Sequence, residues 1–187
     1  MDVEVVPDEF RNVHFDAGEI RALVERLLGE AGLAGRDDVA PVRVEVDEST
    51  PLGRTALVSL QPLVITAQSG ALEDRQRLRQ FGPAEAADAL GRRIFAAADR
   101  LDPAFGAPPL DEEVPLSHAV AWDTYVVGRM ARQGHRPQRQ RRLYTFELRH
   151  GFTDAAVAAF ERLWTADRLS FPEIVAISDE ARAVAVG

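Results

Sequence analysis

Cysteine and lysine are both missing from this chain of 187 residues. Without cysteine, neither a disulfide framework nor a thiolate nucleophile nor a cysteine-ligated metal is possible. Without lysine, Schiff-base catalysis, the lysine of a P-loop and the lysine of a kinase are excluded as well. All 22 basic residues are therefore arginine. Together with the abundance of alanine, glycine, valine, aspartate and proline, this bias indicates a GC-rich genome.

Long apolar runs and targeting patterns are also missing. The longest apolar stretches, such as HAVAWDTYVVG at 118–128, fall far short of the roughly 20 residues that span a bilayer. The first ten residues, MDVEVVPDEF, are acidic and lack the basic and apolar regions of a secretory signal. We therefore expect a soluble protein with no membrane segment and a cytoplasmic location.

The length and composition are those of an ordinary globular domain. Hydrophobic residues make up 46% of the chain and charged residues 28%, and both fractions are typical of globular proteins. A chain of this length can bury a substantial core. We expect a single domain over residues 1–187, with a proline-rich internal connection at 102–115 and a C-terminal helical pair at 152–187 packed on the domain.

Short apolar or alternating segments predict the strands. At 42–48, valines alternate with charged residues, which is the pattern of a half-buried strand. Apolar runs at 55–60 and 63–66 predict two further strands. Another strand is predicted at 142–149, where three apolar side chains alternate with polar ones: Tyr144, Phe146 and Leu148.

Helical periodicity and capping patterns predict the helices. Asp16 and Glu19 have the D-x-x-E spacing of a capping box, and apolar residues follow at helical spacing. The remaining helices are expected over 69–81, from Pro83 to about Leu101, over 118–133 with Ser117 as the N-cap, after Thr153, and after Ser170.

These elements predict an α+β fold, with a small mixed or antiparallel sheet of three to five strands covered by about five or six helices. The order of a helix, three strands and a long helix is similar to that in the N-terminal half of zincin-type peptidases, an analogy of element order alone. The long helix of this chain contains AADALGRRIF at 86–95, with no histidine. The analogy therefore implies a degenerate zincin-like arrangement without the metal motif.

The sequence motifs of several enzyme classes are absent. None of the four histidines has the H-E-x-x-H spacing that places two imidazoles on one helix face; they are His14, His118, His135 and His150. No G-x-S-x-G elbow, G-x-G-x-x-G loop or Walker pattern occurs. We therefore expect no bound metal and no cofactor.

Asp123 has the most apolar sequence surroundings of any acidic residue in the chain. A buried carboxylate needs a charged or hydrogen-bonding partner. In one interpretation, Asp123 is an acid or base in a pocket that it lines with His118, Trp122 and Tyr125. In the other, Asp123 pairs with an internal arginine and the aromatic residues belong to the core.

The net charge of −8 is unevenly distributed along the chain. Residues 129–150 contain seven arginines and one acidic residue, a local charge of +6, so the rest of the chain has a charge of −14. The acidic total argues against binding to duplex nucleic acid. Guanidinium groups form bidentate pairs with phosphates and carboxylates. The candidate ligands for such anions are Arg136, Arg139, Arg141 and Arg142.

The leading hypothesis is a non-enzymatic binding or adaptor protein whose segment 136–142 engages an acidic protein or a phosphorylated ligand. Two simpler interpretations of the segment are a solvated connection and internal neutralisation of the acidic surface. A rival hypothesis is a small enzyme of unknown reaction, with a pocket around His118, Asp123 and Tyr125. A third is a subunit of a larger assembly or homo-oligomer, in which the C-terminal helices present aromatic side chains: Phe160, Trp164 and Phe171.

Overall fold

The computed structural model describes residues 2–109 and 111–186 of the chain. The chain forms two compact units, Met1–Leu101 and Asp102–Gly187, and each is described by itself. The boundary falls at the start of the proline-rich segment 102–115. The expectations of a single domain over 1–187, of a connection at 102–115 and of a packed helical pair at 152–187 stay predictions.

The first unit is built on a four-stranded mixed sheet. Its strands are β1 (Val3–Val6), β2 (Val42–Asp47), β3 (Thr55–Leu60) and β4 (Leu63–Gln68), in the order β1-β2-β4-β3. β1, β2 and β4 are parallel, whereas β3 pairs antiparallel with β4. The predicted alternation in β2 is confirmed, because Val42, Val44 and Val46 are buried and the residues between them are more exposed.

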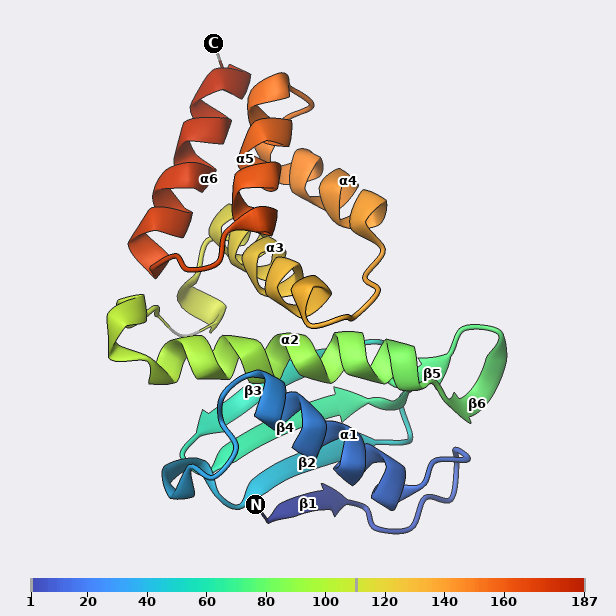
Figure 1. Cartoon of the computed structure of the whole chain (residues 1–187). Coiled ribbons are helices and arrows are strands. Elements are labelled where there is room, and N and C mark those ends of the chain that lie inside the picture. The colour runs from blue at the N-terminus through green and yellow to red at the C-terminus, as the bar shows by residue number, and fades with distance from the viewer. Residues whose placement is uncertain (1, 110, 187) are drawn as a thin grey trace. The chain divides into compact units, whose positions relative to one another are not determined.

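Two helices, α1 (Ala17–Glu30) and α2 (Pro83–Leu101), cover one face of this sheet (Figure 1). α1 begins where predicted, because the Asp16 carboxylate accepts a hydrogen bond from the Glu19 backbone N–H at 3.0 Å. The predicted apolar stripe of α1 is buried, and it comprises Ile20, Leu23, Val24, Leu27 and Leu28. α2 spans the predicted range from Pro83 to Leu101.

The helix predicted over 69–81 is wrong. This segment forms a short 3₁₀ turn, η2 (Ser69–Ala71), followed by a hairpin of β5 (Glu73–Asp74) and β6 (Arg77–Phe81). The Asp74 carboxylate accepts a hydrogen bond from the Gln76 backbone N–H at 2.8 Å and pairs with Arg77. Such side-chain hydrogen bonds to the local backbone compete with helix formation.

The second unit contains four helices, α3 (Leu116–Arg132), α4 (Arg139–His150), α5 (Asp154–Thr165) and α6 (Phe171–Val186). Two 3₁₀ turns precede them, η3 (Pro103–Phe105) and η4 (Asp111–Glu113). α3 packs against the other three helices (Figure 1) and is buried along most of its length. A Cβ at Gly128 would lie 2.2 Å from the Trp164 carbonyl oxygen, so α3 and α5 approach more closely than a side chain would allow.

The predicted N-cap residues are correct for α5 and α6 and wrong for α3. Thr153 caps α5, where its hydroxyl accepts a hydrogen bond from the Ala156 backbone N–H at 3.1 Å. The Glu173 carboxylate accepts a hydrogen bond from the Ser170 backbone N–H at 2.8 Å, as in a capping box. Ser117 is not an N-cap, because α3 follows Pro115 directly and Ser117 is buried within the first turn.

The strand predicted at 142–149 is also wrong, because this segment belongs to helix α4. The buried residues of α4 are Phe146 and His150, which are four apart and share one helix face. Tyr144 and Leu148 are 55% and 54% exposed and lie on the other side. The apparent alternation therefore combines one core residue with two surface residues.

The predicted fold class is confirmed. Over the described residues the chain is α+β, with a mixed sheet of four strands, a two-stranded hairpin and six α-helices. None of the described helices is both long enough and apolar enough to cross a membrane.

Candidate functional site

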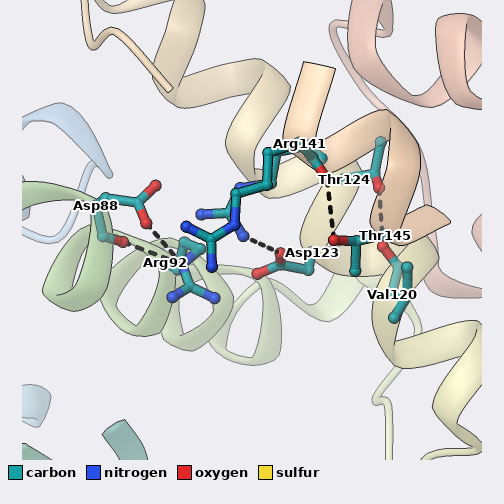
Figure 2. Close-up of polar contacts among 8 residues, drawn as sticks. Asp88, Arg92, Val120, Asp123, Thr124, Arg141 and Thr145 are labelled. Carbon is teal, nitrogen blue, oxygen red and sulfur yellow. Dashed lines mark hydrogen bonds and ion pairs between the residues drawn. The ribbon is translucent and has the colours of Figure 1, made fainter. Parts of the chain in front are cut away.

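Two arginines of the segment 136–142 form ion pairs with neighbouring helices. Arg139 pairs with Glu161 of α5, and its guanidinium lies 5.6 Å from the ring centroids of Phe160 and Trp164. Arg142 Nη1 lies 3.1 Å from Oδ2 of Asp123 on α3, the contact marked by a dashed line at Asp123 in Figure 2. These two arginines attach α4 to α5 and to α3.

Arg132, at the end of α3, has a similar structural role. Its guanidinium donates hydrogen bonds to the backbone carbonyl oxygens of Trp164, at 2.6 Å, and of Ala166. These carbonyl groups lie at the C-terminal end of α5, where the helix leaves its last acceptors unpaired. Arg132 therefore contributes to the packing of α3 against α5.

Arg136, Arg141 and Arg149 differ from the arginines that pair. All three are exposed. In the part of the chain that the structure describes, their guanidinium groups have no hydrogen bond or ion pair with any side chain or carbonyl group. The only hydrogen bond at Arg141 that Figure 2 draws is the one its backbone carbonyl accepts from the Thr145 hydroxyl at 2.9 Å.

The unpaired Arg141 lies beside exposed apolar side chains. Arg141, Tyr144 and Leu148 are spaced three and four residues apart, which places them on one face of α4. Phe152 follows the helix, is 64% exposed, and its ring centroid lies 5.9 Å from that of Tyr144. Arg149 is the sequence neighbour of Leu148. We call these five residues the α4 face: Arg141, Tyr144, Leu148, Arg149 and Phe152.

The N-terminal end of α4 adds to the positive potential of the exposed arginines Arg136 and Arg141. A helix N-terminus has a partial positive charge, which acidic residues in the first turn usually offset. The first turn of α4 contains no acidic residue, and the Gln138 side chain does not cap it. Glu161 and Asp123 neutralise Arg139 and Arg142, so an uncompensated positive charge remains at Arg136 and Arg141.

The three candidate catalytic residues, His118, Asp123 and Tyr125, each contact a different part of the second unit. His118 Nε2 lies 2.8 Å from Oδ1 of Asp179 on α6. Asp123 has the internal arginine partner that the second interpretation of this residue requires, Arg142 of α4. The Tyr125 hydroxyl accepts a hydrogen bond from the Leu169 backbone N–H at 3.1 Å, and its ring contacts Arg129, whose guanidinium lies 4.4 Å from the ring centroid. These contacts of His118, Asp123 and Tyr125 have no residue in common.

The aromatic residues proposed for an assembly surface are buried or half-buried. Phe160 is fully buried, and Trp164 and Phe171 are half-buried. The Phe171 ring packs edge-on against the ring of Trp122 at a centroid distance of 5.5 Å. Part of their surface is therefore used within the unit, and the assembly surface stays a prediction.

Sequence reasoning missed a buried polar pair between α4 and α6. His150 Nδ1 lies 2.9 Å from the Phe146 carbonyl oxygen, and Nε2 lies 2.8 Å from the Ser178 hydroxyl. Burial lowers the pKa of His150, although the Phe146 carbonyl opposes the shift. A neutral ring that donates from Nδ1 and accepts at Nε2 satisfies both contacts. Ser178 is completely buried, so the pair is inaccessible to a substrate.

No group of three or more histidine, aspartate or glutamate side chains is arranged to hold a metal ion, as far as the described residues are concerned.

No family model, curated protein or solved structure matches this chain. Its function must therefore be inferred from its own contacts and charges.

Proposed function

We propose that the protein is a non-enzymatic binding or adaptor module that engages an anionic partner through the arginine segment 136–142. The observation that supports this most directly is the contrast within the segment. Arg139 and Arg142 pair with acidic residues of neighbouring helices, whereas Arg136 and Arg141 are exposed and unpaired among the described residues.

The charge balance makes this contrast unusual. The second unit contains ten arginines and twelve acidic residues, a net charge of −2, and the first unit has a net charge of −6. Acidic side chains therefore outnumber arginines, but none pairs with Arg136 or Arg141 in the described structure. Guanidinium groups that remain unpaired on an acidic protein can form charge-assisted bonds with carboxylates or phosphates of a partner.

The paired arginines have a supporting role in this proposal. Arg139 contacts α5 and Arg142 contacts α3, so the two ion pairs fix the orientation of α4. A binding residue is most effective on an element that its neighbours hold in place. Arg139 and Arg142 are therefore positioning residues, and Arg136 and Arg141 make the contact with the anion.

The experiment that tests the proposal is a titration with fluorescein-labelled poly-L-glutamate, followed by fluorescence anisotropy. The double variant Arg136→Gln/Arg141→Gln should bind about tenfold more weakly than the natural protein, because two charge contacts are lost. The control Arg11→Gln/Arg54→Gln removes two exposed arginines from the first unit and changes the net charge by the same amount. Equal affinities of the two double variants would show that only the total charge matters, and would overturn the proposal.

A further inference from the structure

We infer that the anionic partner is an acidic amphipathic helix of another protein, which lies along α4. Its apolar side chains contact Tyr144, Leu148 and Phe152, and its carboxylates contact Arg141 and Arg149. Resting on the proposed function, with which it shares Arg141, this inference defines the chemistry of the partner and extends the site along α4 to Arg149. It follows from the two properties that the α4 face combines, an exposed apolar row and unpaired positive charges beside it.

The apolar row is concentrated in a short stretch of chain. Tyr144, Leu148 and Phe152 are each more than half exposed and succeed one another at intervals of four residues. Single exposed apolar side chains are normal on a protein surface, but adjacent ones on one helix face mark an interaction site. The Tyr144 and Phe152 rings already contact each other, with centroids 5.9 Å apart. The two rings thus form a joint apolar surface, and Leu148 lies between them in sequence.

The fully exposed charged side chains of α4 have one sign. Arg141 lies one turn before Tyr144, and Arg149 follows Leu148, and neither has an anionic partner among the described residues. Glu147, the only acidic residue of α4, is half-buried. In protein interfaces, positive groups on one partner face negative groups on the other, and these charges surround a central apolar area from which water is excluded. The complementary surface therefore has apolar residues in a row and carboxylates beside them.

A helix meets these requirements better than a small phosphorylated ligand does. A phosphate group would neutralise Arg141 but would leave Tyr144, Leu148 and Phe152 in water. Side chains at i and i+4 form a convex ridge, which packs into the groove between the corresponding rows of a second helix. From Arg141 to Arg149 the face extends about 12 Å, so a partner helix of about three turns covers it. The opposite side of α4 is occupied by α3, α5 and α6.

The test uses two synthetic peptides of fifteen residues with blocked ends and identical composition. In the patterned peptide, leucines recur every three or four residues with glutamates on both sides of the leucine row; in the second peptide the same residues are scrambled. The natural protein should bind the patterned peptide at least about fivefold more tightly than the scrambled one, because only the pattern aligns leucines with the apolar row. Binding is measured by fluorescence anisotropy with labelled peptides.

Two leucine variants provide the matched comparison. Leu148→Gln should lower the affinity for the patterned peptide at least about fivefold, while the scrambled peptide is unaffected. The control, Leu78→Gln, changes a leucine that is 82% exposed on β6 and should leave both affinities unchanged. Circular dichroism of each variant establishes that its helices are intact.

The outcomes separate this inference from the proposed function. Equal binding of both peptides, weakened by Arg141→Gln but not by Leu148→Gln, would retain the anion-binding function and overturn the helical partner. Binding of neither peptide would overturn the inference, and the poly-L-glutamate titration would then decide the function by itself. Self-association of the natural protein in sedimentation, abolished by Leu148→Gln, would assign the face to a second copy of the chain and would likewise overturn the inference.

Discussion

Arg142 of α4 and Asp123 of α3 form an ion pair across two helices, with Nη1 3.1 Å from Oδ2 and both side chains less than one-third exposed. The two residues belong to competing hypotheses. Asp123 is the candidate acid or base of the enzyme hypothesis, and Arg142 is a candidate anion ligand of the binding hypothesis. The contact agrees with the interpretation in which Asp123 pairs with an internal arginine.

A double-mutant cycle on this pair should give a favourable coupling energy of about 1 kcal/mol, at the upper end of the range for incompletely buried ion pairs. The variants are Asp123→Asn, Arg142→Gln and the combination of both. Both tryptophans of the chain, Trp122 and Trp164, lie in the second unit, so urea unfolding followed by their fluorescence reports on that unit. Additive effects of the two substitutions would show that the ion pair contributes nothing to stability.

Gly128→Ala should destabilise the second unit by about 2 kcal/mol or more, since overpacking forces the backbone of a close helix pair to move. The added Cβ would meet the Trp164 carbonyl oxygen at 2.2 Å, a backbone atom that cannot rotate away. Urea unfolding followed by tryptophan fluorescence measures the loss.

Gly29→Ala in α1 is the matched control, because no atom lies within 4 Å of a Cβ built at Gly29. Unfolding followed by circular dichroism should show no loss of stability, and a gain of up to about 1 kcal/mol is expected from helix propensity. A similar loss in both variants would indicate a general intolerance of alanine, not a close approach of α3 and α5.

The stability of the second unit should fall as the pH is lowered from about 7 to about 5.5. Burial lowers the pKa of His150 in the folded state, so the unfolded chain takes up this proton at a higher pH than the folded chain. The free energy of unfolding therefore decreases on acidification, by at most about 1.4 kcal/mol per pH unit for this one group. Urea midpoints from tryptophan fluorescence at three pH values measure the slope.

His150→Gln should make the urea midpoint less dependent on pH across this range. His14→Gln, which removes an exposed histidine from the first unit, should leave the slope unchanged. Hydrogen bonds from Ser170 lower the pKa of Glu173. The ionised Glu173 carboxylate therefore contributes to folding stability, and this stability is lost only as the pH falls below the usual range of a carboxyl group. The two effects therefore occur in different pH ranges. An unaltered slope in His150→Gln would contradict the account of the buried pair.

The sequence predicted the elements whose signals are local. The Asp16 carboxylate caps α1 three residues away, Pro83 begins α2, and the valines of β2 alternate within six residues. Each signal is contained in the element that it specifies, so no knowledge of the rest of the chain was needed. The fold class follows from these elements and their order.

The remaining features depend on contacts between residues distant in sequence. In α4, Tyr144 and Leu148 fit both the period of a strand and the four-residue repeat of a helix, and the buried position of Phe146 and His150 depends on packing against other helices. Likewise, the arginines of the segment look alike in sequence. Arg139 and Arg142 differ from Arg141 only through Glu161 and Asp123, which are 22 and 19 residues away from their partners.

The central claim is that the exposed face of α4 is where the partner binds, and amide chemical-shift mapping tests it most directly. The ¹⁵N-labelled protein is titrated with the unlabelled patterned peptide, and shifts are compared between the natural protein and Leu148→Gln. We predict that the largest shifts occur at residues 136–152 and decrease in the variant. Shifts concentrated in the first unit, for example around β5 and β6, or the same shifts in the variant, would contradict the claim.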